Sequence, residues 1–388
     1  MPKRRKVTTV RRTFNRALIE TTLFLENVVG FCTRDVLASF AVTCKATLAS
    51  VVMTLTEHRL WPVSTLLNDA KTKWTWTEYP GRMAHVRTIW IDSAVDELPM
   101  DLTNCKEVLF KELGDTPSDF PPLTNSMFPV GVENLWFQSV VTPGYFEHVD
   151  VLPDTVRVVN FAGARNLKRG LLPAGVEKLE IAVYAGDLSG VLPLGLVHFR
   201  ISQYSTTIQP GTLPAGLRML RVDNGMRIVE NALPTSMHSL HVDGPLRLHP
   251  ANVLSRATGL RFLTLGRRTN LHRLAHGMLP PNLIELEVAF RFDHPLEQEV
   301  LPRGLERVVF HSSVDITPGS LPEGLLHVTL GDNFCDLLEP EMLPQSLEQL
   351  RISTNYVSDW PDLVQNIRAA FPRLEVDIYE PSPHNNEL

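Results

Sequence analysis

Few residues of this 388-residue sequence have the types and spacing that chemistry requires. His272 and His276 stand four apart, the spacing with which two imidazoles bind a metal from one face of a helix. The segment lacks the glutamate of a zinc protease and is predicted as a loop, so we expect a solvated histidine pair. Cys44 lies in an apolar stretch with no required histidine partner, which favours a buried packing thiol over a nucleophile.

Other catalytic patterns do not occur in the sequence. It contains neither a glycine-rich phosphate loop nor the Gly-x-Ser-x-Gly turn of serine hydrolases. We therefore expect no catalytic residue, no metal and no cofactor, and we predict that the chain is not an enzyme. A metal or cofactor bound to the purified protein would contradict this prediction.

Basic residues are concentrated at the start of the chain. Residues 1–16 hold seven lysines and arginines and no acid, so the remaining 30 basic residues face 43 acidic ones, a net charge of −13. The body of the chain is therefore not built to hold a nucleic-acid backbone, and we do not expect nucleic acid as a partner. Within the basic start, Lys3, Arg4, Arg5 and Lys6 resemble a nuclear import signal, and a solvated basic tail is the alternative.

Cysteine usage and hydropathy bear on the compartment. Cys32, Cys44, Cys105 and Cys335 are scattered without a Cys-x-x-Cys pair, and no apolar signal-peptide core follows the basic start. This favours free, mostly buried thiols in a reducing compartment, and hence a cytoplasmic or nuclear protein. No run of about 18 uncharged apolar residues occurs, so we expect no membrane partner.

An internal repeat determines the elements that must position any functional residue. Ten segments share a Leu-Pro or Phe-Pro step, and three more fit the register without proline, at Met83, Leu102 and Ala257, so that thirteen units start 19 to 27 residues apart. Counted from the proline, the third, sixth and eighth residues are apolar in every unit. The sixth and eighth alternate with polar neighbours, which predicts a short strand with one buried face in each unit.

Such units cannot bury their apolar faces alone, but stacked units can. The sequence therefore predicts a repeat solenoid, leucine-rich-repeat-like, with a parallel β-sheet on its concave face. The proline and the small residue two positions later are expected to bend the chain tightly before each strand. The segment from Ile316 to Phe334 resembles the FNIP repeat, a relative of the leucine-rich repeats, and the resemblance covers roughly residues 80–355.

Residues 14–60 show apolar residues at helical spacing, which predicts three short helices. They resemble an F-box, the α-helical module that docks a substrate receptor onto the Skp-type adaptor of a cullin–RING ubiquitin ligase. Glu20 stands where the family has proline, and Thr47 or Leu48 where it has tryptophan; a plain helical cap of the solenoid is the alternative. The resemblance implies that the following residues bind the adaptor: Leu23, Phe24, Val28, Phe31, Val36, Cys44 and Lys45.

The predicted organisation has five parts. They are a basic tail at 1–13, the F-box-like domain at 14–60, a linker or capping segment at 61–80, the solenoid at 81–355, and a C-terminal cap and tail at 356–388. In the cap, Asp359 is expected to cap a helix that starts at Pro361. The apolar stripe of this helix and the alternating residues of a last strand are Leu363, Val364, Ile367 and Ala370, followed by Leu374, Val376 and Ile378.

The fifth, seventh and ninth residues of each unit should project from the inner sheet into solvent. Two outward tryptophans near one end are either a binding hot spot or rings covered by the N-terminal region, and a basic stripe in mid-solenoid could select an acidic segment. Further along, Glu285 and Glu287 reverse the sign of the charge. The predicted target-binding residues are Trp90, Trp136, His198, Arg200, Arg221 and His241.

These two parts together predict a substrate receptor. Residues 14–60 would hold the Skp-type adaptor and its cullin complex, and the concave sheet would hold a protein target. An interaction scaffold without a ubiquitin-ligase link is the alternative.

Overall fold

A computed structural model describes residues 61–62, 88–91, 102, 104–110, 122–146, 148, 150–204, 207–269, 271 and 273–380. The chain forms two compact units. Unit 1 comprises Met1–Ser139, Gly144–Glu147 and Val151–Val156. Unit 2 comprises Val140–Pro143, His148–Asp150 and Arg157–Leu388.

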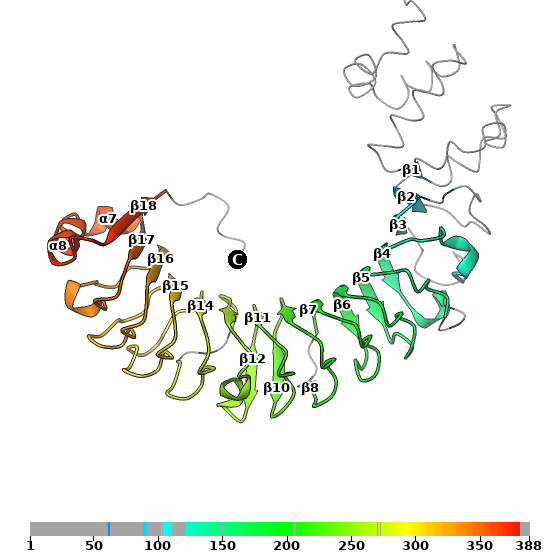
Figure 1. Cartoon of the computed structure of the whole chain (residues 1–388), viewed down its shortest axis with the longest axis horizontal. Helices are drawn as coiled ribbons and strands as arrows, with labels where there is room; N and C mark the ends of the chain where they lie inside the picture. The colour runs from blue at the N-terminus through cyan, green and yellow to red at the C-terminus, as the bar shows by residue number, and fades with distance from the viewer. Residues whose placement is uncertain are drawn as a thin grey trace, which may run out of the picture. The chain divides into compact units, whose positions relative to one another are not determined.

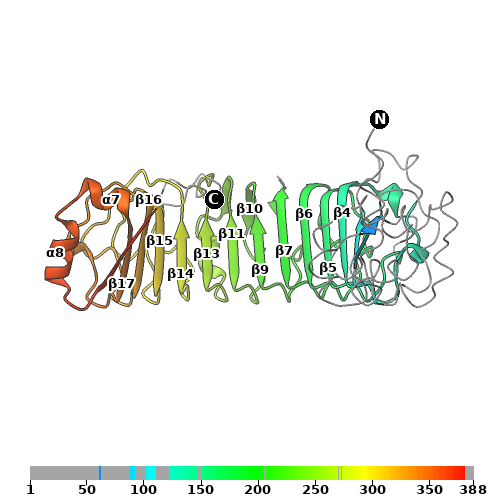
Figure 2. The ribbon, with the colours of Figure 1, turned by 90° about the horizontal axis from the view of Figure 1, so that it is seen from above.

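Unit 2 is built on a parallel sheet in which each strand pairs with the next one along the repeat. The strands line the concave side of this unit, and the return segments form its outer side (Figure 1, Figure 2). This confirms the predicted position of the sheet. In sheet order the strands are β5 (Val158–Arg165), β6 (Lys178–Ala185), β7 (His198–Gln203), β9 (Met219–Val222), β11 (Ser239–Val242), β13 (Phe262–Leu265), β14 (Glu285–Val288), β15 (Arg307–Ser312), β16 (His327–Asn333), β17 (Gln349–Ser353) and β18 (Glu375–Tyr379).

The core of unit 2 is formed by the apolar columns of the repeat. On β9, Leu220 and Val222 are 0% and 1% exposed, and the register places them beside Phe199 and Ile201 of β7. All described residues of the third, sixth and eighth positions are buried, as the repeat predicts. Because side chains alternate between the two faces of a strand, the fifth and seventh residues face solvent.

The corner before most strands of unit 2 is a turn closed by the proline carbonyl, and Ala257 takes the place of the proline before β13. Before β7, the carbonyl oxygen of Pro193 accepts a hydrogen bond from the N–H of Leu196 at 3.2 Å. A Cβ on Gly195 would lie 2.3 Å from the carbonyl oxygen of Ala174 in the preceding corner, while the backbone of Gly195 is outside the left-handed region. Close stacking of successive coils therefore requires the small residue here, rather than the bend that the sequence suggested.

Polar residues at the same corner position link neighbouring coils. The hydroxyl of Ser236 donates to the carbonyl oxygen of Leu217 at 2.7 Å, and the hydroxyl of Ser346 donates to that of Leu325 at 2.7 Å. These hydrogen bonds satisfy carbonyl groups in the corners before the strands, which the backbone hydrogen bonds between the strands do not use.

A second sheet lies on the outer side of unit 2 (Figure 1). It consists of β8 (Thr207–Ile208), β10 (Met226–Val229) and β12 (Leu246–His249), which pair in parallel in the order β12-β10-β8. The return segment that contains β12 continues into a 3-10 helix, η6 (Val253–Arg256), and a later return segment has η7 (Pro340–Met342). The sequence analysis did not predict this sheet.

Unit 1 contains the parallel strands β1 (Trp61–Pro62), β2 (Thr88–Ile91) and β3 (Glu107–Phe110) and most of β4 (Asn134–Val141), paired in that order. The 3-10 helices η4 (Asn125–Met127) and η5 (Pro143–Tyr145) precede and follow β4. Phe110 and Phe137 stack with ring centroids 4.8 Å apart, and Phe128 and Phe146 contact them edge-on. The segment predicted as a linker or capping region at 61–80 thus supplies β1.

The helical cap at the end of unit 2 differs from the prediction. Its first helix, α7 (Thr354–Asp359), begins after Ser353, whose hydroxyl accepts a hydrogen bond from the N–H of Tyr356. Asp359 is the last residue of α7, so the prediction that it caps a helix starting at Pro361 is wrong. The next helix is α8 (Leu363–Ala370), with Asp362 at the cap position. The pattern did not reveal α7 because Tyr356 is its one buried residue.

The predicted apolar stripe of α8 is partly correct. Leu363 and Ile367 are buried, whereas Ala370 is exposed. The last strand is confirmed as β18, but Ile378 is 40% exposed because β18 is the terminal strand of the sheet.

Candidate functional site

The parallel register arranges the solvent-facing residues of unit 2 in rows that cross the strands. Arg200, Arg221 and His241 lie side by side in the seventh-position row on β7, β9 and β11. His198 stands two residues before Arg200 on β7. The residues predicted as a basic stripe are therefore brought together by the fold.

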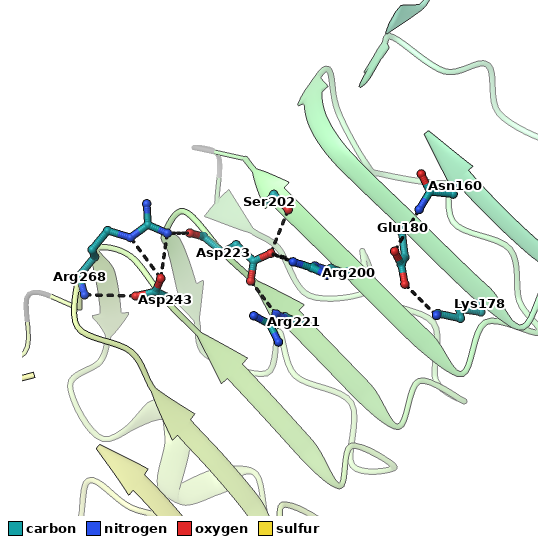
Figure 3. Close-up of polar contacts among 9 residues, drawn as sticks. All are labelled: Asn160, Lys178, Glu180, Arg200, Ser202, Arg221, Asp223, Asp243 and Arg268. Atoms are coloured by element: carbon teal, nitrogen blue, oxygen red, sulfur yellow. Dashed lines mark hydrogen bonds and ion pairs between the residues drawn. The ribbon is translucent and has the colours of Figure 1, made fainter. Parts of the chain in front are cut away.

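One carboxylate, Asp223, holds both arginines (Figure 3). The Nε of Arg200 donates to its Oδ2 at 2.8 Å, and the Nε of Arg221 donates to its Oδ1 at 2.7 Å. Ser202 also donates to Oδ2, at 2.9 Å. Desolvation raises the pKa of Asp223, but the hydrogen bonds from Arg221, Arg200 and Ser202 outweigh it, so the pKa lies below its usual value.

A similar carboxylate stands one strand further along, on the residue after β11. Asp243 binds Arg268, whose Nη2 lies 2.8 Å from its Oδ2, and its Oδ1 accepts a hydrogen bond from the backbone N–H of Arg268. The Nη2 of Arg268 also donates to the carbonyl oxygen of Asp223. Arg268 therefore ties the segment after β13 to the ends of β9 and β11 (Figure 3).

The two histidines of the stripe differ in environment. His198 is exposed, whereas His241 is half-buried between its neighbours. Burial first, and then the positive charge of Arg221, lower the pKa of His241 despite the nearby carboxylates. Since a lowered pKa keeps the imidazole neutral at neutral pH, the positive charge around His241 comes from the arginines.

Two exposed apolar side chains flank this cluster. Met219 on β9 is 44% exposed and Phe262 on β13 is 45% exposed. Both occupy the fifth-position row, with Ser239 of β11 between them. The sequence analysis missed them, although the fifth-position column of the repeat contained the signal: apolar residues where a solvent-facing position is expected.

Beyond β13, the solvent-facing residues of the fifth- and seventh-position rows become acidic. Glu285 and Glu287 lie on β14, directly beside Phe262 and Thr264. Glu287 binds the Nε2 of His311 at 2.7 Å and accepts a hydrogen bond from Thr264 at 3.2 Å. The hydrogen bond from His311 lowers the pKa of Glu287. The predicted reversal of charge is thus present on the strand face.

In unit 1, the predicted tryptophan row is present in the backbone register. Trp90 of β2 lies opposite Leu109 of β3, which lies opposite Trp136 of β4. Trp136 is half-buried, and its shielded Nε1 has no hydrogen-bond partner among the residues that the structure describes. The side chain of Trp90 lies outside the described residues.

Several predicted residues fall outside the part of the chain that the structure describes. They are the adaptor-binding residues Leu23, Phe24, Val28, Phe31, Val36, Cys44 and Lys45, the import-signal residues Lys3, Arg4, Arg5 and Lys6, and also His272 and Cys32. Their predicted roles stay predictions.

The two described cysteines are free. Cys105 is buried, as expected for most of the thiols, and burial raises the pKa of its thiol to about 11, whereas Cys335 is exposed. Among the described residues, no three His, Cys, Asp or Glu side chains are grouped as metal ligands. None of the described helices has the length and hydropathy needed to cross a membrane.

Comparison with known proteins supports the repeat architecture. The family model of the FNIP Repeat matches residues 270–313 and 315–355, which confirms the predicted resemblance over this part of the chain. No curated protein matches the sequence.

Two solved structures are similar to the chain at 19% sequence identity. CroV588, described as a novel circular LRR protein, has a TM-score of 0.47, and the similarity covers 76% of this chain and 54% of CroV588. YopM from Yersinia enterocolitica WA-314 has a TM-score of 0.34, with 70% of this chain and 74% of YopM covered. The chain thus spans about half the length of CroV588.

Proposed function

We propose that the chain is a protein-binding repeat protein that acts as the substrate-recognition subunit of a cullin–RING ubiquitin ligase. The observation that carries the binding role is the solvent-facing side of the unit 2 sheet, which presents aligned rows of side chains on successive parallel strands. An extended surface of this kind contacts a partner at many points along its length.

The composition of the rows supports a protein target. Arginine and aromatic residues are enriched at protein interfaces, and here Arg200, Arg221 and Phe262 stand on β7, β9 and β13, with β11 between the last two. Trp136 of unit 1 and the histidines His198 and His241 remain part of the proposed target-binding set. We propose binding rather than catalysis: other subunits would transfer ubiquitin, and this chain would supply proximity.

A photo-cross-linking experiment tests the binding face. A photoreactive amino acid replaces either Met219 on the strand face or Arg247 on β12 of the outer sheet, which is equally an exposed strand position. In extracts of cells that express the chain, we expect the target to cross-link at position 219 at least tenfold more than at position 247. Equal yields, or more at position 247, would contradict the assignment of the face.

The ligase link is supported by the resemblance of residues 14–60 to an F-box. We expect the full chain to bind a purified Skp-type adaptor in calorimetry, and Phe31→Asp to weaken this binding at least tenfold. Arg247→Asp, a charge change on the outer sheet, should leave it unchanged. If the wild-type chain does not bind the adaptor, the interaction scaffold without a ligase link is the function that the strand face supports.

The basic segment Lys3–Lys6 supports a further part of the proposal, which is import into the nucleus. Replacing Lys3, Arg4, Arg5 and Lys6 by alanine in a fluorescent fusion of the full chain should abolish nuclear accumulation. An unchanged distribution would identify the segment as a solvated tail.

A further inference from the structure

We propose that Arg200, Arg221, Met219 and Phe262 form a recognition site for an extended acidic peptide segment. One carboxylate of the segment binds between the two guanidinium groups, and an apolar side chain packs on Phe262 or Met219. This inference rests on the proposed binding role of the strand face and names the chemistry of the partner.

The first support is the way in which Asp223 orients the two arginines. It binds Arg200 through Nε and Nη2 and Arg221 through Nε. The remaining guanidinium N–H groups make no hydrogen bond to any described residue, and the side chains of Arg200 and Arg221 are 45% and 41% exposed. Two oriented guanidinium groups with outward N–H donors match the geometry with which arginine binds carboxylates.

The second support is the local charge. Within this part of the face, Lys178 pairs with Glu180 and Arg268 pairs with Asp243. Asp223 neutralises one of its two arginines and leaves one positive charge in excess. The complement of this site is therefore a single carboxylate rather than a highly charged chain.

The third support is the position of the apolar residues. Met219 lies two residues before Arg221 on β9, about 7 Å away along the strand. Phe262 lies on β13, two strand spacings from β9 and in the row of Met219, so its diagonal distance from Arg221 is about 12 Å. In an extended peptide, residues two and four positions apart are separated by about 7 and 13 Å. The site therefore fits an Asp or Glu two to four residues away from a large apolar residue.

The neighbouring charges favour a peptide over a nucleic acid. Glu285 is directly opposite Phe262 in the sheet, and Glu287 follows it on β14. A phosphate backbone crossing these strands would meet the two glutamates, since nucleic-acid affinity depends on many cationic contacts in succession. A peptide carries its negative charge at one residue and avoids them.

A peptide selection against the full-length chain tests the site. The probe is a displayed library of random 12-residue peptides, and the affinity of the most enriched peptide is measured together with that of its Glu→Gln or Asp→Asn analogue. We expect enriched peptides to share the acid-to-apolar spacing and the neutral analogue to bind at least tenfold more weakly. Arg221→Ala should weaken binding at least tenfold and Phe262→Ala about fivefold. Arg351→Ala, an arginine of the same row on β17, should change it less than twofold.

Three outcomes would overturn the site. Enriched peptides without an acid, or peptides that bind equally well to Arg221→Ala, would exclude it. A phosphoserine in place of the acid that binds more than a hundredfold tighter would exclude a carboxylate ligand in favour of a phosphopeptide. If a peptide binds the Arg221→Ala variant as tightly as the wild type and also blocks target cross-linking at position 219, this site is excluded but the assignment of the binding face is retained. If no cross-link depends on the strand face, the proposed function itself fails.

Asp223→Asn separates orientation from charge. This substitution adds one positive charge to the site, so electrostatic attraction alone predicts tighter binding of an acidic peptide. If Asp223 orients the two arginines, the peptide should dissociate from the Asp223→Asn variant about fivefold faster than from the wild type, while its association should be no slower. Slower dissociation would show that Asp223 does not position the arginines. Thermal unfolding of the variant checks that the fold is intact.

Discussion

Strands β7 and β9 and strands β14 and β15 share one register and one core, yet they arrange their outward charges differently. Arginines surround one carboxylate in the first pair, whereas the glutamates of β14 face Arg307 and His311 of β15 in the second. Leu220 of β9 and Leu286 of β14 are both 0% exposed and occupy the same column of the repeat. On the outer rows, one carboxylate holds two arginines at β7 and β9, whereas Glu287 of β14 binds His311 of β15. The inward columns are fixed by stacking, so differences in recognition are confined to the outward columns.

The largest effect should come from the columns that the two regions share. Leu220→Ala and Leu286→Ala each remove a fully buried side chain, and each should lower the free energy of unfolding by about 2–5 kcal/mol. Urea denaturation of the full chain measures both. Ser239→Ala on the outer row of β11 is the control and should cost little. A clear difference between the two leucine variants would show that the two regions are not packed alike.

The corners before the strands differ between the two regions in how closely successive coils approach each other. A Cβ at Gly195, before β7, would lie 2.3 Å from the Ala174 carbonyl oxygen, whereas a Cβ at Gly304, before β15, would have its nearest neighbour 4.0 Å away. Gly195→Ala should therefore cost about 1–3 kcal/mol because the coils must move apart. Gly304→Ala should be nearly neutral. Thermal unfolding of both variants checks the pair, and equal melting temperatures would contradict the role of close stacking.

The sequence predicted the shared features well because they recur in every unit. The column that contains Leu220 and Leu286 has a residue in each of the thirteen units, so the period and the register of the repeat could be read from the spacing alone. Asp223 was not assigned a role because its function depends on arginines from two strands, one of them 23 residues away. Arg268 reaches Asp223 across 45 residues and lies in a segment with no repeat signature. The F-box resemblance and its adaptor residues stay predictions.

The outward row of β7 and β9 should contribute less stability than the core. The pKa of Asp223 is below its usual value, so its stabilisation is present above the pKa of the unfolded carboxyl, about 4, and is lost as pH falls through the folded value. Asp223→Asn should destabilise the chain by about 1 kcal/mol at neutral pH. In urea denaturation at pH values decreasing from about 4, the difference from wild type should shrink. A difference that grows toward acid pH would contradict the assignment.

The stabilisation from the outward row of β14 and β15 should weaken as pH rises, whereas that from Asp223 weakens as pH falls. Glu287 pairs with His311, and the pair is ionic only when His311 is protonated, which acid favours. Glu287→Gln should therefore cost about 0.5 kcal/mol at pH 5 and less at pH 8. The guanidinium partners of Asp223 keep their charge over this range, so the cost of Asp223→Asn should be the same at both pH values. Urea denaturation of the two variants at pH 5 and pH 8 measures this contrast, and parallel behaviour would show that the two charged rows are held in the same way.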